Sequence, residues 1–205
     1  MADIRLETVT GKALEPHIGA LADLRIRVFR DFPYLYDGTA EYEAQYLQTY
    51  LQCPEAAIVL ALDGDQVVGA ASCLPMQAED EAFQQPWLEH AARLGMDVSL
   101  AQLFYCAESV LDARYRGRGI GVAFFREREA HAARLGGFSH ICFCAVDRPP
   151  DHPLRPADYT PLDAFWQNRG YRKQDKIQAH FRWKDIDQPQ ETEKTMTFWL
   201  KELSA

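Results

Sequence analysis

A glycine-rich turn between an apolar strand and an amphipathic helix constrains the fold of this chain more than any other stretch. Residues 101–111 are largely apolar and predict a strand. The turn Arg116-Gly117-Arg118-Gly119-Ile120-Gly121 follows, and residues 121–135 then show the apolar spacing of a helix that two glycines end. The next run, 138–146, is apolar on both faces, as in a strand buried between helices. The chain must therefore build a sheet that helices cover.

Hydrophobic periodicity predicts the other elements of the fold. Strands are expected at 4–10, 176–184 and 194–203, a hairpin at 56–74, helices at 13–30, 41–51 and 161–171, and a partly helical excursion at 81–95. A loop at 147–161, rich in Pro and Asp, is short enough to be an insertion beside a site. The order predicts an α/β or α+β fold with a mixed sheet of about six to seven strands flanked by helices. One domain is expected to cover residues 1–205.

Composition and charge limit the class of function. The formal net charge of −8 argues against a nucleic-acid partner, because phosphate contacts need basic surface. No apolar run approaches the roughly 20 residues that span a bilayer, and the start of the chain lacks a signal-peptide pattern, so we expect a cytoplasmic protein without a membrane partner. The five cysteines are an odd number in apolar runs and predict buried free thiols. Cys142 and Cys144 fit a strand face better than a zinc site, so no metal is expected.

Acidic and basic residues are segregated along the chain. Residues 31–92 contain no Lys or Arg but many Asp and Glu, whereas basic side chains are frequent from Arg114 onward. The first part would therefore suit a cation and the second a polyanion. The alternative is that these charges only keep the protein in solution.

The glycine-rich turn has the chemistry of an anion site. A helix N-terminus presents backbone N–H groups without intrahelical partners, and its dipole favours an anion. Gly117, Gly119 and Gly121 leave space for a diphosphate at those groups, and Arg116 and Arg118 add positive charge. The turn lacks the Gly-Lys-Ser/Thr ending of the nucleotide P-loop and the G-x-G-x-x-G order of the dinucleotide fingerprint. A glycine-rich turn that binds nothing is the alternative.

Two motifs together resemble those of the GNAT-superfamily N-acetyltransferases. The order Arg-x-x-Gly-x-Gly at Arg116, Gly119 and Gly121 is similar to the family's acyl-CoA signature, and FWQNRGY at 165–171 is similar to its second signature. The resemblance implies a mixed sheet that is splayed open between residues 101–111 and 138–146, with acetyl-CoA as co-substrate and no metal. The pantetheine arm and the pyrophosphate would then bind Ser109, Val110, Leu111, Arg116, Gly117, Arg118, Gly119, Ile120, Gly121 and Val122.

The reaction that the resemblance implies is direct transfer, in which an amine attacks the thioester and a backbone N–H near Val110 stabilises the oxyanion. A base must first take a proton from the ammonium ion. Glu108 interrupts the apolar strand just before the turn, where burial would make its carboxylate a better proton acceptor. The same residue could instead be a strand-end carboxylate that faces solvent or pairs with an arginine. Trp166 replaces the family's helix tyrosine, a general acid, so we expect Tyr159 to serve as the acid, with Tyr105 or no acid as alternatives.

The acceptor would contact the first two helices and their link, as the resemblance implies. That link is aromatic and acidic, and Phe32, Tyr34 and Tyr36 are expected to bind a small cationic amine. The insertion at 147–161 is a second candidate wall, and Asp147 stands where relatives usually carry an Asn. We therefore expect an acetyl-CoA-dependent N-acetyltransferase that acts on the primary amine of a small molecule.

Several alternatives stay open. The acceptor could be a protein or peptide amine, and the acyl chain could be longer than acetyl. The domain could also be a non-catalytic acyl-CoA-binding sensor, because the helix tyrosine is missing. A covalent route would use an acyl-cysteine on Cys106, Cys142 or Cys144. The terminal strands are rich in aromatic residues and could pair between subunits to form a homodimer.

Overall fold

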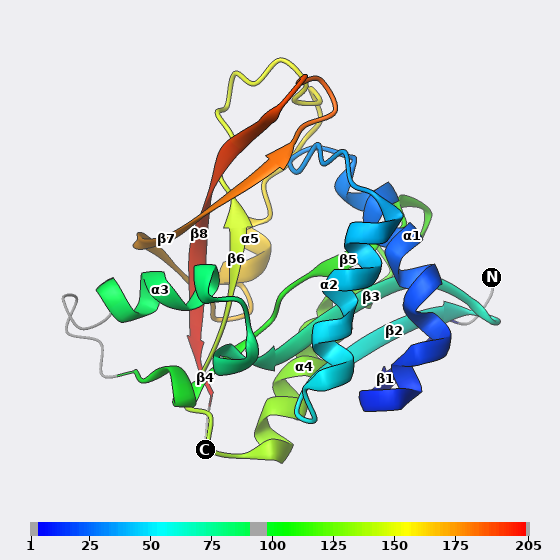
Figure 1. Ribbon diagram of the computed structural model, residues 1–205, viewed down its shortest axis with the longest axis vertical. Helices are drawn as coiled ribbons and strands as arrows, with labels where there is room; N and C mark the ends of the chain where they lie inside the picture. Colours follow the sequence, from blue (N-terminus) through cyan, green and yellow to red (C-terminus); the bar gives the residue numbers. More distant parts are fainter. Residues whose placement is uncertain (1–3, 91–97, 204–205) are drawn as a thin grey trace.

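The computed structural model describes residues 4–90 and 98–203, which form a twisted sheet with helices on both faces (Figure 1). The strands are β1 (Arg5–Val9), β2 (Ala57–Asp63), β3 (Gln66–Pro75), β4 (Leu103–Tyr105), β5 (Ser109–Leu111), β6 (His140–Val146), β7 (Arg172–Lys184) and β8 (Glu191–Glu202). The α-helices are α1 (Ile18–Phe29), α2 (Ala40–Gln52), α3 (Glu81–His90), α4 (Ile120–Leu135) and α5 (Asp163–Gln167). The predicted fold class, a mixed sheet flanked by helices, is confirmed.

The sheet contains eight strands in the order β1-β2-β3-β4-β6-β8-β7, and β5 pairs with β3 off this path. Neighbouring strands are antiparallel except β4 and β6, which are parallel. There are more strands than predicted because the apolar stretch expected as one strand over 101–111 forms two short ones.

A β-bulge at Ala107 and Glu108, opposite Ser72 of β3, separates β4 from β5. Ser72 O accepts a hydrogen bond from Ala107 N–H at 3.2 Å, and Ser72 N–H donates to Glu108 O at 3.1 Å, so two residues face one. The ladder between β4 and β6 runs as far as the bond from Cys106 N–H to Cys142 O, at 2.8 Å. Beyond this point β5 stays with β3, whereas β6 continues beside β8. The sheet therefore splays open between β5 and β6, as the resemblance implies.

Helices α1, α2 and α3 cover one face of the sheet, and α4 and α5 cover the other (Figure 1). Strand β2 shows why the sequence of a central strand is apolar at successive positions. Its residues Ile58 and Leu60 pack in the core under α1 and α2, whereas Val59 and Ala61 pack with Phe124 of α4. Because successive side chains of a strand point to opposite faces, both sets must be apolar when both faces are covered.

Several segments differ from the elements that periodicity predicts, and the helix expected over 161–171 is limited to α5. The helix expected over 13–30 begins as a 3-10 helix (Gly11–His17), which contains Pro16, and α1 starts only at Ile18 because proline has no N–H for an α-helical ladder. The excursion expected at 81–95 is helical over α3, and its residues 91–95 lie outside the described part of the chain. Strands β7 and β8 extend into a long hairpin whose tip reaches the link between α1 and α2 (Figure 1).

Candidate active site

A cavity of about 1150 Å³ lies where the sheet splays open. Residues 106–109, from the β4–β5 connection and the start of β5, line it on one side of the splay, and residues 143–147, at and just after the end of β6, line it on the other. Residues within 116–122 line it from the α4 face, and residues within 28–34 line it from the α1 face. The insertion also contributes, through residues within 155–161. The cavity thus joins the two regions that the sequence singles out, the glycine-rich turn and the α1–α2 link.

Helix α4 begins at this cavity without a side-chain cap. Its N-cap residue, Gly119, has φ +80° and ψ −3°, a left-handed conformation that favours glycine, and Gly117 has φ +76°. The first intrahelical bond runs from Ala123 N–H to Gly119 O at 3.0 Å, so the N–H groups of residues 120–122 have no partner within the helix. A Cβ on Gly119 would meet no atom within 4 Å. Three backbone donors at the positive end of the helix dipole therefore lie beside free space, which fits a phosphate group.

The two arginines of the turn are placed differently. Arg116 is exposed and lines the cavity. Arg118 does not line it, because its Nη2 donates to Arg114 O at 3.2 Å and its guanidinium lies 5.1 Å from the centre of the Tyr115 ring. Arg116 is therefore the turn's arginine that is placed to meet an anion in the cavity.

Strand β5 presents alternate backbone groups to the cavity. Asp112 N–H bonds to β3 at 2.9 Å and Val110 pairs with Ala70, so the ladder register directs Val110 N–H toward β3. Ser109 and Leu111 occupy the non-hydrogen-bonded positions, and their N–H groups point to the opposite edge, where the sheet is open. Both residues line the cavity, whereas the Val110 side chain is buried in the core. The donors near Val110 that can reach an oxyanion are therefore those of Ser109 and Leu111.

Glu108 lies at the bulge, lines the cavity and is 9% exposed. Its Oε2 is 2.7 Å from Arg25 Nη1 and accepts a hydrogen bond from the Tyr46 hydroxyl at 3.1 Å. Arg25 also donates to the fully buried Glu43, and its guanidinium lies 4.4 Å from the centre of the Tyr46 ring. Glu108 is therefore buried and paired with an arginine instead of facing solvent, while it also lines the cavity.

Two carboxyl groups share one buried cation in this cluster, which we call the Arg25 cluster (Arg25, Glu43 and Glu108). Burial acts to lower the pKa of Arg25, but the Glu108 carboxylate and its other neighbours outweigh burial, so the pKa is raised and the guanidinium stays charged. Sequence reasoning missed Arg25 and Glu43. The signal was a charge on an apolar helix face, because Arg25 is buried beside Leu21 in α1 and Glu43 is buried beside Leu47 in α2.

A chain of hydroxyl groups lies behind Glu108. Tyr46 OH is 3.0 Å from Tyr50 OH, which accepts a hydrogen bond from Ser72 Oγ at 3.1 Å. Glu108 N–H donates to the same Ser72 Oγ at 3.3 Å. Burial raises the pKa of both Tyr46 and Tyr50, so their hydroxyl groups are protonated at neutral pH. Tyr42, which shares their spacing on α2, is 58% exposed and lies outside this chain. The hydroxyl groups of this chain therefore hydrogen-bond both the carboxylate and the backbone N–H of Glu108.

The predicted acid, Tyr159, lines the cavity, and its ring meets the Phe32 ring edge-on with 4.6 Å between centres. Burial raises the pKa of Tyr159, so its hydroxyl carries a proton at neutral pH, as a general acid must. Tyr105 is buried outside the cavity lining, and its hydroxyl lies 3.1 Å from Cys144 Sγ. Trp166 of α5 lines the cavity without a hydroxyl to offer. Tyr159 is thus better placed for proton transfer than Tyr105.

Of the three aromatic residues expected to bind the acceptor, two line the cavity and one does not. Phe32 and Tyr34 line the cavity, whereas Tyr36 does not. Tyr36 forms a β-bridge with Asp185, and its ring packs against another aromatic ring of α2. Leu35 between the two tyrosines has φ +55°, a conformation that breaks the alternation of an extended chain. Tyr34 and Tyr36 therefore face different surroundings despite their spacing of two.

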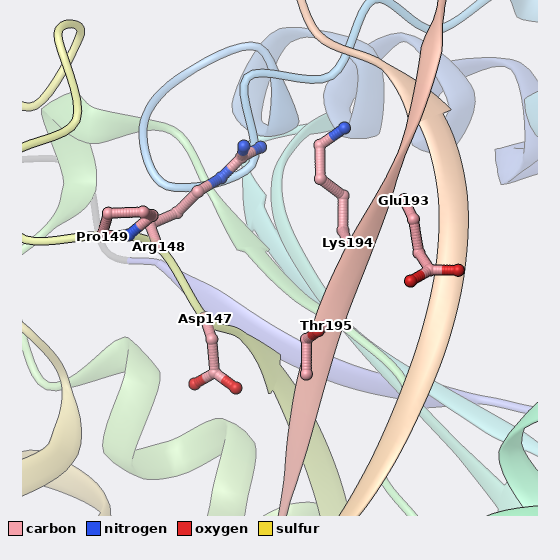
Figure 2. A pocket seen from close by; sticks show the side chains of 6 residues that line it. All are labelled: Asp147, Arg148, Pro149, Glu193, Lys194 and Thr195. Carbon is pink, nitrogen blue, oxygen red and sulfur yellow. The ribbon is translucent and has the colours of Figure 1, made fainter.

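Asp147 directly follows β6 and makes two polar contacts. Its Oδ2 accepts a hydrogen bond from Thr197 Oγ1 at 2.5 Å, and its Oδ1 lies 3.7 Å from Lys173 Nζ. Asp147 and Arg148 also line a second, smaller pocket of about 420 Å³ with Pro149, Glu193, Lys194 and Thr195 (Figure 2). Figure 2 shows that the side chains of Asp147 and Arg148 point in opposite directions. Their roles are therefore separate although they are adjacent.

The cysteines are buried free thiols, as predicted. Burial raises the pKa of Cys106 to about 11 and that of Cys144 to about 12, so neither thiol is ionised to act as a nucleophile at neutral pH. Within residues 4–90 and 98–203, no three His, Cys, Asp or Glu side chains group as metal ligands would. In the same part of the chain, no helix combines the length and the apolar character that crossing a membrane requires.

Comparison with models of known protein families identifies the family of this chain. Residues 21–157, from α1 to the insertion, match the family model described as the acetyltransferase (GNAT) family. No sequence among curated proteins matches the chain.

Solved structures show the same fold at low sequence identity. Arabidopsis thaliana NAA60 in complex with acetyl-CoA superimposes with a TM-score of 0.61 at 13% identity, over 99% of this chain and 100% of that one. Ribosomal-protein-alanine N-acetyltransferase from Brucella melitensis gives a TM-score of 0.59 at 15% identity, over 97% and 99% of the two chains. An acetyltransferase from Thermus thermophilus gives a TM-score of 0.54 at 19% identity, over 98% of this chain and 97% of that one. At these identities the likeness establishes a common fold and no common acceptor.

Proposed function

Because the chain belongs to the acetyltransferase (GNAT) family, we propose that it moves the acetyl group of acetyl-CoA to the primary amine of a small cationic molecule. Family membership makes the chain an acyltransferase that uses acetyl-CoA. The small cationic acceptor is the part that we infer. The observation that carries it is the Arg25 cluster, in which two carboxyl groups share one guanidinium beside the cavity.

The charge of this cluster supports a cationic acceptor. Glu43 and Glu108 together exceed the single positive charge of Arg25, so an ammonium ion in the cavity would balance the remaining negative charge. Phe32 and Tyr34 line the same cavity and would offer aromatic faces to such an ion. The Glu108 carboxylate and the aromatic residues of the α1–α2 link thus supply both kinds of contact that an ammonium ion favours.

Contacts across the acceptor side of the cavity support a small molecule over a polypeptide. The insertion meets the α1–α2 link there, since the Tyr159 and His152 rings lie 4.6 and 5.8 Å from the Phe32 ring. A peptide chain laid between these two segments would have to separate the rings. A small amine would need no such opening.

The groups of the chain can account for the proton and charge movements of the transfer. Acetyl-CoA supplies the reactive thioester, and the N–H groups of residues 120–122 would hold its diphosphate. Glu108 would take a proton from the ammonium group and so free the amine to attack. The N–H groups of Ser109 and Leu111 would stabilise the oxyanion. Tyr159 would donate its proton to the departing thiolate, and the second proton that the amine nitrogen loses would restore the Tyr159 hydroxyl.

The test is thiol release from acetyl-CoA with a panel of acceptors. Polyamines, aminoglycosides, amino acids and peptides with free N-termini would be compared at the same concentration, and propionyl-CoA and longer acyl-CoA would replace acetyl-CoA. We expect kcat/KM for a small polyamine or aminoglycoside to exceed that for peptides by about tenfold or more. Faster turnover of peptides would contradict the small acceptor. Tight binding of CoA without turnover of any amine, at any pH, would indicate a sensor instead.

We also propose that residues 1–205 act as one domain. In support, a single sheet order joins β1 from the start of the chain to β7 and β8 from its end. The cytoplasmic location and the homodimer stay predictions.

A further inference from the structure

The α1–α2 link (residues 30–39) forms a wall of the cavity with little regular structure of its own. Phe32 and Tyr34 line the cavity, and apart from one bridge the link contains no strand or α-helix. A segment of this kind needs contacts from elsewhere to hold its side chains in one place, because ordering each residue costs about 1–2 kcal/mol of conformational entropy. The structure supplies these contacts from two directions.

From the end of β6, the buried guanidinium of Arg148 contacts the link. Arg148 Nε donates to Pro33 O at 2.6 Å, and Arg148 Nη2 donates to Tyr34 O at 2.6 Å. Nη1 and Nη2 also donate to the two carboxylate oxygens of Asp185, at 2.8 and 2.9 Å. The side chains of Arg148 and Asp185 are 7% and 3% exposed. Figure 2 shows the Arg148 side chain extending from the strand end away from Asp147.

The hairpin of β7 and β8 makes the contacts from the other direction. Trp183 Nε1 donates to Tyr34 O at 3.1 Å, and Ile186 N–H donates to Leu35 O at 2.7 Å. Asp185 in this hairpin is also 3.3 Å from Lys194 Nζ. Arg148 therefore ties three separate segments together: the link, the end of β6, and the hairpin tip.

We propose that Arg148 is a positioning residue for acceptor binding, which it achieves by holding Phe32 and Tyr34 at the cavity wall. The inference rests on the proposed function only in taking this wall as the acceptor side. Arg148 lines the cavity, yet its guanidinium already donates four hydrogen bonds to protein oxygens, so it acts through the link instead of binding an anion. A wall that is ordered before the acceptor arrives lowers the entropic cost of binding.

The test compares Arg148→Met and Arg148→Lys with a matched control. Lys201→Met removes a part-buried ion pair with Glu129 (2.7 Å) that lies away from the link, on the α4 side of the sheet. Lysine cannot reach two carbonyl oxygens and a carboxylate at once, so Arg148→Lys should show the same pattern as Arg148→Met at smaller amplitude. Arg148→Lys also keeps a buried cation beside Asp185, so it carries the test if Arg148→Met fails to fold.

The first readout is hydrogen exchange, which needs no acceptor. We expect amides in 31–37 and 183–187 to exchange at least about tenfold faster in both Arg148 variants, while α4 amides keep their rates. The Lys201→Met control should leave the link unchanged. Unaltered protection of the link in both Arg148 variants would overturn the proposal.

The second readout is steady-state kinetics with the best amine of the panel. We expect the acceptor KM to rise about tenfold or more while the acetyl-CoA KM stays within about twofold. Equal increases in both KM values would indicate a general structural role and overturn the proposal. An acceptor effect without faster exchange would indicate direct contact with the acceptor and would also overturn it. If the wild-type protein turns over no amine, the proposed function fails and the exchange result alone decides the role of Arg148.

Discussion

Replacing Gly119 by alanine tests the anion site at the start of α4 and separates binding from folding. Gly119 has φ +80° and ψ −3°, so any L-residue there adopts the left-handed conformation at a cost of about 1–2 kcal/mol. No atom lies within 4 Å of the position of the new Cβ, so no clash adds to this cost. For a chain of this size, we expect the melting temperature to fall by about 2–8 °C.

The effect on acetyl-CoA should be larger than the effect on stability. The new methyl group enters the free space beside the N–H groups of residues 120–122, where the diphosphate would bind. Each hydrogen bond to a charged group that is lost costs about 1.5–3 kcal/mol, which corresponds to roughly a 10- to 100-fold loss of affinity. Gly119→Val, with its larger side chain, should abolish measurable binding while the protein stays folded.

The control is Gly64→Ala in the turn between β2 and β3. Gly64 has φ +59° and equally open space around its Cβ position, and it does not line the cavity. Its substitution should lower the melting temperature by a similar amount and leave affinity unchanged. Thermal unfolding and calorimetric titration with acetyl-CoA and with CoA measure the two quantities. If Gly119→Val binds acetyl-CoA as tightly as the wild-type protein, the assignment of the diphosphate to this helix terminus is wrong.

Three further substitutions test the remaining groups. Glu108→Gln should keep CoA affinity and lower kcat mainly below the pKa of the acceptor amine, which a pH–rate profile measures; unchanged rates at neutral pH would remove Glu108 as the base. Tyr159→Phe keeps the ring contact with Phe32 and should lower kcat with little change in the acetyl-CoA KM. Tyr105→Phe should leave kcat unchanged. Equal kcat for Tyr159→Phe and wild type would exclude Tyr159 as the acid. Glu79 is buried, and burial raises its pKa from 4.5 to about 8. The contribution of Glu79 to the stability of the wild-type protein is therefore complete below its unfolded pKa and is lost as the pH rises through about 8. The unfolding free energy of Glu79→Gln, measured by denaturant titration, should therefore rise relative to that of wild type between about pH 5 and pH 8. A difference between variant and wild type that does not change with pH, as expected for the exposed Glu81→Gln, would contradict that pKa.

The parts of the site that the sequence predicted are those that depend on neighbours along the chain. A glycine at the N-cap of α4 needs only its own backbone angles and the helix that follows, and both are local. The apolar runs of β2 and β6 likewise predict strands covered on both faces, because a side-chain period of two requires it. The conformation of the turn and the fold class therefore follow from residues that are close together in the sequence.

The parts that were missed depend on residues far apart in the sequence. The division of the 101–111 stretch into β4 and β5 follows from a bulge opposite Ser72, and nothing within the stretch itself marks it. Arg25 and Glu43 showed only as charges on apolar faces, and their meeting with Glu108 required α1 and α2 to pack against the same part of the sheet. The separation of Tyr34 from Tyr36 is a local exception, because it depends on the positive φ of the single residue between them.

The sequence by itself thus determined a sheet covered by helices, a glycine turn that opens a helix, and the family to which such a turn points. The tertiary structure alone decided what surrounds Glu108 and what holds the α1–α2 link. The physical reason is that turn and helix signals are set by backbone conformation over a few residues. A buried ion pair, or an arginine such as Arg148 that joins three segments, exists only after the chain has brought distant residues together.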